Sequence, residues 1–330
     1  MNGNIRIITG NANRLLAEEI ASHAALNCSL TDASVGRFPG GEVRIEINEN
    51  VRGCDVFVIQ PICENKTYAL SPNDALMELL ALIDAARRSS ARRITAVLPY
   101  YGYARQDRKD RPRVPITAKL VANMITTAGA DRVLTLDLHS NQIQGFYDIP
   151  VDHLYSIATF VKVLQRHGVD GVVSPDVGNA KMTRAYAEKL DCDWLVIDKR
   201  RKNGVKTEVL NIVGNPVGKR LALIDDLTST GGTIANAAEI LRDKGATEVC
   251  AVVIHPVFAT DPAVGIDCIK LLSLSSLSAV YVSDSISLAG KPASDKIKII
   301  SISELLAEAI DHIHKDESVS VMFKNVSVEG

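Results

Sequence analysis

Short apolar runs rich in Val, Ile and Leu alternate along the chain with segments of helical periodicity. The runs predict strands at 6–9, 43–47, 56–60, 95–99 and 133–137, and again at 172–174, 194–197, 221–224, 249–254, 279–282 and 297–301. Strands that alternate with helices are typical of parallel α/β architecture. Because the pattern restarts after about residue 150, we predict an α/β fold of two similar open parallel-sheet domains with helices on both faces.

Two helices stand out in the pattern. The segment Asn73–Ser89 places apolar side chains on one helical face, which indicates core packing: Leu76, Leu79, Leu80 and Ile83. A last helix is predicted to begin near residue 303, with Ser303 as its N-cap. Its inward face would carry Leu305, Leu306, Ala309, Ile310 and Ile313.

The composition is ordinary for a globular protein. The chain has 330 residues, 46% of them hydrophobic and 23% charged, with a net charge of −2. This balance argues against a general polyanion-binding surface, so we expect no nucleic-acid partner. Six cysteines without C-x-x-C spacing favour reduced thiols. No apolar run approaches the roughly 18 residues of a membrane span and no targeting segment is recognised. We therefore expect a cytoplasmic protein.

The segment 221–236 combines an apolar strand, two carboxylates, a turn rich in hydroxyls and glycine, and a helix. Glycines allow a tight turn, and the amides at the start of the helix then point toward one anion. Asp225 and Asp226 follow the strand, where they can accept hydrogen bonds from sugar hydroxyls. These residues predict a site for a phosphorylated sugar: Asp225, Asp226, Thr228, Ser229, Thr230, Gly231, Gly232 and Thr233. The alternative is an ordinary capped turn.

This segment resembles the phosphoribosyl-diphosphate loop that phosphoribosyltransferases share with phosphoribosyl-diphosphate (PRPP) synthetases. A second run, Asp137–Asp152, places an acid and an imidazole after another apolar strand. A lone histidine is more often structural than a ligand. This run, however, resembles the signature of ribose-phosphate diphosphokinases, the PRPP synthetases, with Tyr147 where that family usually has Phe. The resemblance extends over roughly residues 5–323.

The resemblance implies a reaction and assigns each of the two substrates to its own domain. The family transfers the β,γ-diphosphoryl group of ATP to the 1-hydroxyl of ribose 5-phosphate and thereby feeds nucleotide biosynthesis. It implies an ATP-side domain at residues 1–150 plus 304–330 and a ribose-5-phosphate-binding, phosphoribosyltransferase-like domain at 151–303. Magnesium is the implied cofactor. His139 and Asp176 are its implied ligands, an unusual pair for an ion that prefers oxygen. Asp176 belongs to a motif in which Asn179 replaces a glycine.

Two segments are assigned to ATP. The basic run after residue 99 reads by itself as a solvated charged loop, a nucleotide site or an RNA-binding patch. The resemblance assigns its residues Arg105, Gln106 and Asp107 to ATP. The segment 38–42 resembles an adenine-binding motif that reaches a neighbouring subunit, which assigns Phe38 and Glu42. Gly40 stands where the family usually has a polar side chain.

Asp198–Arg201 follows another predicted strand and opens a loop that contains Gly, Asn and Lys. Its charges alone are typical of a surface turn. The segment resembles the mobile catalytic loop of the family, which assigns to Lys199 and Arg201 the compensation of charge in the transition state.

The resemblance also implies regulation and assembly. Phosphate and ADP are the expected effectors at an anion site between subunits, with Arg52, Arg111, Ser318 and Ser320 as its parts. Asn50 and Pro112 stand where the family usually has serines. Rings built from dimers imply a homohexamer.

Three alternatives remain at this point. A phosphoribosyltransferase shares the 225–233 loop but does not need the 105–107 and 137–152 segments. A catalytically silent regulatory subunit of the same family is disfavoured because His139, Asp176, Lys199 and Arg201 are present. A nucleic-acid-binding module comes last, since the chain lacks an extended basic area.

Overall fold

The computed structural model describes residues 3–202, 206–261, 263 and 265–323, together with their side chains except those of 199–202, 206–210 and 323. The described chain forms two compact units. Unit 1 contains the chain up to Tyr155, Ser285–Lys291 and Ser301–Phe323, and unit 2 contains Ser156–Asp284 and Pro292–Ile300. Unit 1 is thus assembled from three separate stretches of sequence.

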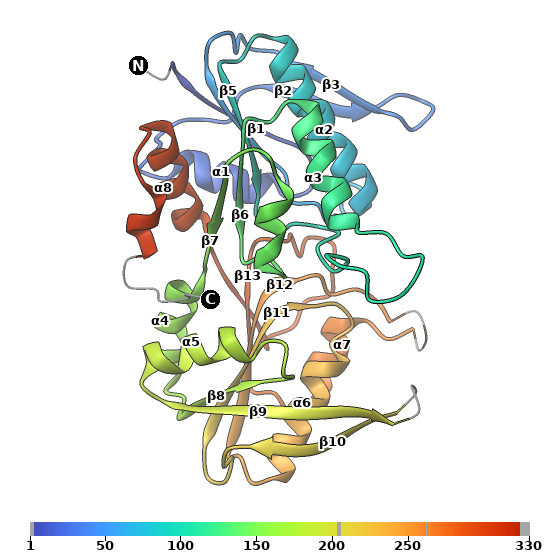
Figure 1. Ribbon diagram of the computed structural model, residues 1–330, viewed down its shortest axis with the longest axis vertical. Coiled ribbons are helices and arrows are strands. Elements are labelled where there is room, and N and C mark those ends of the chain that lie inside the picture. The colour runs from blue at the N-terminus through green and yellow to red at the C-terminus, as the bar shows by residue number, and fades with distance from the viewer. Residues whose placement is uncertain (1–2, 203–205, 262, 264, 324–330) are drawn as a thin grey trace. The chain divides into compact units, whose positions relative to one another are not determined.

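Unit 1 is built on a five-stranded parallel sheet with the strand order β1-β4-β5-β6-β7 (Figure 1). Its strands are β1 (Ile5–Thr9), β4 (Asp55–Ile59), β5 (Arg93–Leu98), β6 (Arg132–Leu136) and β7 (Val151–Leu154). Every residue of β4 is buried, as expected for a strand covered on both faces of a parallel sheet. An antiparallel hairpin of β2 (Ala33–Arg37) and β3 (Val43–Ile47) is attached to this unit.

The helices of unit 1 cover both faces of its sheet (Figure 1). They are α1 (Arg14–Ser22), α2 (Pro72–Arg88), α3 (Thr117–Ala128) and α8 (Ser303–His314), with the 3₁₀ turns η1 (Asn141–Phe146) and η2 (Val319–Phe323). Helix α2 packs against α3 and β3, whereas α1 packs against α8. Ser71 and Asp74 form a capping box at the start of α2, with Pro72 in the first turn. These signals explain why this helix begins where it does.

Unit 2 is built on a seven-stranded sheet with the order β10-β9-β8-β11-β12-β13-β14. Its strands are β8 (Gly171–Ser174), β9 (Asp193–Lys202), β10 (Lys206–Val213), β11 (Arg220–Thr228), β12 (Glu248–Pro256), β13 (Val280–Ser283) and β14 (Ile297–Ile300). All neighbours are parallel except β9 and β10. The helices are α4 (Ile157–His167), α5 (Ala180–Leu190), α6 (Gly232–Asp243) and α7 (Cys268–Leu274).

The predicted α/β class with two parallel-sheet units is confirmed, and several element predictions need correction. Strands β2, β7 and β10 were not expected. The segment 43–47 belongs to the hairpin rather than to a parallel sheet. Ser303 is the first helical residue of α8, whose N-cap is Ile302. The boundaries at 150/151 and 303/304 stay a prediction, because compactness does not reveal which substrate each unit binds.

Two buried polar clusters hold unit 1 together. Glu78 of α2 has an exposed fraction of 1%, and its carboxylate accepts hydrogen bonds from the Asn11 backbone amide at 2.9 Å and from Gln60 Nε2 at 2.8 Å. Asp55 of β4 accepts two hydrogen bonds from Arg93, at 2.9 and 2.6 Å, and lies 2.9 Å from His314 Nδ1 of α8. Both carboxylates are therefore buried with partners, as burial of a charge requires.

Candidate functional site

The 225–233 segment takes the conformation that its residue types predict. β11 carries Asp225 and Asp226 near its carboxyl end, and α6 begins at Gly232. The two carboxylates are 8% and 7% exposed. Gly231 has φ +81°, and a Cβ at this position would lie 2.8 Å from Cys268 Sγ. Only glycine fits both the backbone conformation and the space at this turn.

Several groups at this turn are suited to binding an anion. The first amides of α6 have no acceptor inside the helix, and their dipoles favour negative charge. Thr228 is 5% exposed, and its Oγ1 has no hydrogen-bond partner within the described chain. The carbonyls of Thr228 and Ser229 accept the amides of Phe258 and Ala259, at 3.1 and 2.8 Å. The loop backbone is therefore anchored while a buried hydroxyl remains available.

The electrostatics around Asp225 are unusual. Burial raises the pKa of this carboxyl well above its ordinary range, and the charges of Asp226 and Asp176 raise it further. Asn179 donates hydrogen bonds to both acidic side chains: its Nδ2 lies 2.5 Å from Asp225 Oδ1 and 3.4 Å from Asp226 Oδ1. Three acidic groups of unit 2 thus lie close together, and the Asn179 side chain donates to two of them.

Asp176 occupies the turn between β8 and α5. Its Oδ1 accepts the backbone amides of Gly178 at 2.8 Å and Asn179 at 3.2 Å. The Ser174 hydroxyl donates to the Asp176 carbonyl at 2.5 Å. These contacts fix the Asp176 turn at the carboxyl edge of the unit 2 sheet, just after β8, which is the strand adjacent to β11.

In unit 1, Asp137 and His139 follow β6 at the carboxyl edge of that sheet. Asp137 is 8% exposed with φ +37°, and His139 is exposed. The following amide, that of Leu138, donates to His153 Nε2 at 2.9 Å, and Gln144 lies 3.2 Å from His153 Nδ1. His153 therefore holds the backbone of this turn.

The sequence analysis did not single out His153 as a site residue. Its only available signal was its place directly after the run Asp137–Asp152. Neither spacing nor composition indicates that the imidazole accepts a backbone hydrogen bond.

The hairpin segment assigned to ATP is exposed. Phe38 has an exposed fraction of 50% and follows β2, and Glu42 precedes β3. The Phe38 amide donates to the Glu42 carbonyl at 2.9 Å, which closes the hairpin end. Next to this turn, Arg37 Nη1 lies 2.9 Å from Asp74 of α2. That pairing and the capping contacts from Ser71 hold the pKa of Asp74 well below its usual range.

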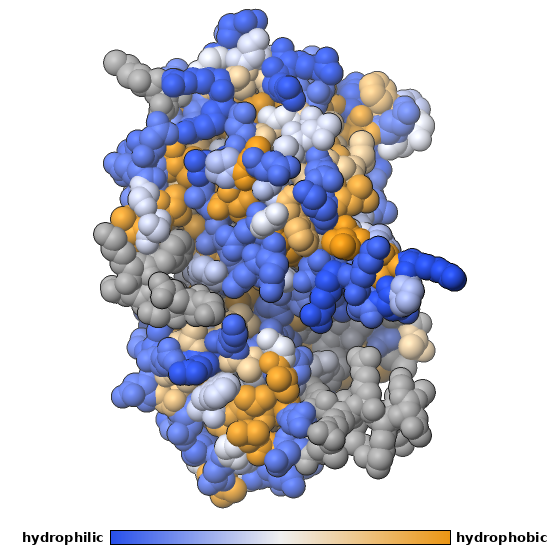
Figure 2. Space-filling view, in the orientation of Figure 1, coloured by the Kyte–Doolittle hydropathy of each residue, from blue (hydrophilic) through white to orange (hydrophobic). Residues whose placement is uncertain are grey.

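The basic segment between β5 and α3 is a loop on the surface of unit 1. Figure 2 shows hydrophilic side chains protruding where Figure 1 draws this loop. Arg105 and Gln106 are exposed and Asp107 is half-buried. Thr117 Oγ1 donates to Gln106 Oε1 at 3.2 Å, and Ala118 N donates to the Gln106 carbonyl at 3.2 Å. Gln106 is therefore tied to the start of α3.

The segment 198–201 differs from its prediction. It lies inside β9, paired antiparallel with β10, and does not end the strand. The side chains of Lys199 and Arg201 are outside the described residues, so their assignment stays a prediction.

The four residues assigned to an effector site all belong to unit 1. Arg52, Arg111, Ser318 and Ser320 are exposed, and the two serine hydroxyls lie 2.7 Å apart. No hydrogen bond or ion pair joins either arginine to these serines within the described ranges.

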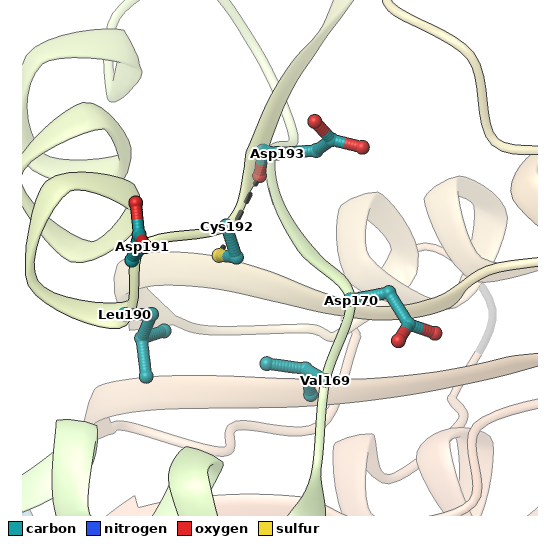
Figure 3. Close-up of a pocket in the computed structure, with 6 residues that line it drawn as sticks. All are labelled: Val169, Asp170, Leu190, Asp191, Cys192 and Asp193. Carbon is teal, nitrogen blue, oxygen red and sulfur yellow. Dashed lines mark hydrogen bonds between the residues drawn. The ribbon is translucent and has the colours of Figure 1, made fainter.

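One cavity lies at the opposite edge of the unit 2 sheet from Asp225. Its volume is about 520 Å³, and Val169, Asp170, Leu190, Asp191, Cys192 and Asp193 line it (Figure 3). It adjoins the starts of β8 and β9, whereas the candidate sugar site is at the strand ends. Burial and the neighbouring carboxylates raise the pKa of Cys192 to about 11. The thiol is consequently protonated near neutrality and is a weak nucleophile.

The described residues were compared with the patterns of metal sites, membrane-spanning helices and disulfides. Among the residues that the structure describes, no three His, Cys, Asp or Glu side chains gather in a way that could hold a metal ion. No helix in those ranges is long and apolar enough to span a bilayer. All six cysteines are free thiols.

Comparison with known proteins covers almost the whole chain. Residues 5–129 match the family described as the N-terminal domain of ribose phosphate pyrophosphokinase, and residues 168–324 match the phosphoribosyl synthetase-associated domain. A ribose-phosphate pyrophosphokinase of Fusobacterium nucleatum is 48% identical over 324 residues, which cover 97% of this chain and 98% of the relative. One of Rhizobium meliloti is 49% identical over 97% of this chain and 100% of the relative.

A solved structure gives the same result for the fold. The crystal structure of phosphoribosylpyrophosphate synthetase from Mycobacterium smegmatis superposes with a TM-score of 0.85 at 36% sequence identity, over 95% of this chain and 99% of that chain. Pyrophosphokinases generally use a metal ion. With both family domains matched and close relatives aligned from end to end, the chain belongs to the ribose-phosphate pyrophosphokinase family.

Proposed function

We propose that the chain transfers the β,γ-diphosphoryl group of ATP to the 1-hydroxyl of ribose 5-phosphate and releases PRPP and AMP. The observation that carries the proposal is the β11–α6 turn. It places two buried carboxylates, the unpartnered Thr228 hydroxyl and a helix N-terminus together in a chain of the pyrophosphokinase family.

Each part of this turn matches one part of a sugar phosphate. The first amides of α6 and the hydroxyls of 228–233 would bind the 5-phosphate, because both are hydrogen-bond donors. Asp225 and Asp226 would accept hydrogen bonds from the ring hydroxyls. Thr228 Oγ1 supports this assignment, since a buried hydroxyl without a partner is costly unless a ligand satisfies it.

The ATP side of the reaction is assigned to unit 1. Arg105, Gln106 and Asp107 lie on the exposed loop before α3, where a cation can meet phosphates. Half of the Phe38 surface is exposed, which suits stacking on a purine, and Glu42 lies at the other end of the same turn. In the proposed assembly this hairpin would serve a neighbouring subunit.

The metal ion proposed for the reaction is Mg²⁺, with Asp176 and His139 as its protein ligands. Mg²⁺ is commonly held by one or two carboxylates together with substrate phosphates, so a small protein ligand set fits an ion that arrives with ATP. Asp176 suits this role because two amides fix its Oδ1, while its Oδ2 has no hydrogen-bond partner in the described chain. When bound, the ion would neutralise phosphate charge.

For this reaction the protein mainly has to align the two substrates and to stabilise the negative charge of the transferred group. The β11–α6 turn would hold the sugar with its anomeric oxygen directed at the β-phosphorus. Lys199 and Arg201 would stabilise the negative charge that spreads over the transferred group. We assign no general base.

The proposal also covers the effectors of the enzyme, its oligomeric state and its location in the cell. Phosphate and ADP would act at the anion site that includes Arg52, Arg111, Ser318 and Ser320. The functional form would be a homohexamer in the cytoplasm, with neither a nucleic acid nor a membrane as partner.

A ³¹P NMR time course of the protein with MgATP and ribose 5-phosphate tests the activity. We expect AMP and PRPP to appear together, in equal amounts, and only when both substrates are present. ADP as the nucleotide product would indicate an ordinary kinase. An unchanged spectrum would indicate a catalytically silent family member.

Asp226→Asn tests the sugar assignment in the same assay. Losing one charged hydrogen bond should cost about 1.5–3 kcal/mol, which corresponds to a roughly ten- to hundredfold higher KM for ribose 5-phosphate. The KM for ATP should stay within a few-fold. The matched control is Asp243→Asn, at the exposed C-terminal end of α6.

A further inference from the structure

The side chain of Asn179 directly contacts both carboxylates of the candidate sugar site. Asn179 is the last residue before α5, at the carboxyl end of β8, and it stands where the motif of the family has glycine. Its Nδ2 lies 2.5 Å from Asp225 Oδ1 and 3.4 Å from Asp226 Oδ1. A glycine at this position could make neither contact.

The chemistry of the contact fixes which end of the carboxamide faces the acids. A carboxamide nitrogen carries two donors, and here Asn179 Nδ2 donates to Asp225 Oδ1 and Asp226 Oδ1. The opposite orientation would place the carboxamide oxygen against two acidic groups. The side chain of Asn179 therefore acts here as a donor shared between Asp225 and Asp226.

The side chain has no local structural task that would explain its presence. Asn179 is the N-cap of α5, yet its side chain makes no capping hydrogen bond. Its backbone does make local contacts, because its carbonyl accepts Thr183 Oγ1 at 3.0 Å and its amide donates to Asp176 Oδ1. Those backbone contacts would survive a change of side chain.

The cluster brings several acidic groups close together, where the side-chain amide of Asn179 meets two of them. Asp225 is 8% exposed, and the charges of Asp226 and Asp176 both act on it. Asp226 hydrogen-bonds to Asp225 through its backbone and its side chain, and the Asn179 amide adds a donor that bridges both side chains. A carboxylate offers about four acceptor positions, so one amide contact leaves positions for sugar hydroxyls.

We infer that Asn179 is a positioning residue of the ribose site: its side-chain amide holds Asp225 and Asp226 in the paired orientation that accepts the hydroxyls of ribose 5-phosphate. The inference rests on the proposed function. Preorganisation of this kind raises affinity because the ordering cost is met before the ligand arrives.

Steady-state kinetics of four variants, with direct ribose 5-phosphate binding by calorimetry, test the role. Asn179→Ala removes the donor and should raise the KM for ribose 5-phosphate about tenfold. Asn179→Asp has nearly the same shape but replaces the donor with another acceptor, so its loss should be larger. Asn179→Gln retains an amide and should recover part of the affinity. The control, Glu188→Gln at the exposed end of α5, should match the wild type.

Two further readouts separate positioning from a general structural effect. The KM for ATP should stay within a few-fold in every variant, and melting temperatures should be close to that of the wild type. In an Asp225→Asn background, Asn179→Ala should cause a smaller further loss than in the wild type, since residues that act together are not additive.

The outcomes distinguish the inference from the function on which it rests. Wild-type protein that neither binds ribose 5-phosphate nor forms PRPP would overturn both. Wild-type binding together with equal affinity in Asn179→Ala, or equal losses in Asn179→Ala and Asn179→Gln, would overturn the positioning role alone. A loss that appears equally in the KM values of both substrates would also overturn it.

Discussion

The hydroxyl of Tyr147 donates to the hydroxyl of Tyr101 at 3.2 Å, and the two rings meet edge to face with centroids 6.3 Å apart. Tyr101 in turn donates to the carbonyl of Ala118 in α3 at 2.9 Å. Both tyrosines are buried. This relay connects the turn after η1 to the segment that begins the basic loop and to the first turn of α3.

We predict that Tyr147→Phe lowers stability by about 0.5–1.5 kcal/mol, the net value of one neutral hydrogen bond. Tyr101→Phe should cost more, because it leaves the buried Tyr147 hydroxyl without its acceptor. Thermal unfolding followed by circular dichroism checks the order. Equal losses, or a larger loss for Tyr147→Phe, would contradict the relay.

We predict that Lys199→Ala and Arg201→Ala each lower kcat by several orders of magnitude and leave both KM values within a few-fold. Groups that act mainly in the transition state appear in kcat. Lys162→Ala on the exposed surface of α4 provides the matched control. A rise in KM at unchanged kcat would remove the catalytic assignment.

We predict relaxed selection of the purine base, because Gly40 offers no side chain to the adenine edge. Discrimination of this kind arises when the wrong substrate leaves polar groups unpaired. A Cβ at Gly40 would meet nothing within 4 Å, so Gly40→Asp should fold normally and raise the preference for ATP over GTP. The ratio of kcat/KM for the two nucleotides is the measurement. A strong preference that is the same in both proteins would assign base selection to other groups.

We predict that phosphate activates the enzyme and that ADP inhibits it partly without competing with ATP. Two arginines with two hydroxyls form a suitable anion site. Each hydroxyl that is lost at Asn50 and Pro112 is worth about 0.5–1.5 kcal/mol, so the enzyme should need a few-fold more phosphate than a relative with serines there. Equal activity without phosphate and in millimolar phosphate, with purely competitive ADP, would leave the arginines structural.

We predict that stability declines as the pH rises above about 9. Burial raises the pKa values of Cys63 and Cys250 to about 12 and that of Cys192 to about 11, from an ordinary value of 9.0. The unfolded chain would ionise these thiols first, so stability is fully present below pH 9 and is lost as the pH rises toward the folded-state values. Melting temperatures from pH 7 to 11 provide the test. Cys192→Ala should flatten part of the decline, and an unchanged slope would contradict its contribution.

The elements that could be predicted are those with strong local signals. Helix α2 has a capping box, a proline in its first turn and a clear apolar face, so its bounds agree with the prediction to about one residue. Strand β4 begins with Asp55 and continues as the apolar run Val56–Ile59. Strand β2 is half-exposed, and β10 begins with the polar residues Lys206 and Thr207. Their strand structure depends on pairing partners, which periodicity does not reveal.

In the candidate site, too, local features could be predicted from the sequence, whereas contacts between distant residues could not. The 225–233 turn could be predicted because all its groups lie within nine residues of sequence and glycine dictates its shape. The contact of Asn179 with Asp225 joins residues 46 positions apart. Similarly, the buried position of Glu78 depends on Asn11 and Gln60, which donate hydrogen bonds to it from outside α2. Such long-range contacts require the folded chain.

The discontinuous make-up of unit 1 has a consequence for the order of events during synthesis. Asp55 and Arg93 leave the ribosome early, whereas His314 and the rest of α8 are made only after Ser156–Asp284 and Pro292–Ile300 of unit 2. Until then the α8-facing side of α1 and the end of β4 that carries Asp55 are uncovered. The nascent first unit is therefore incomplete for most of translation, and chains that terminate before residue 301 would expose apolar surface that favours aggregation.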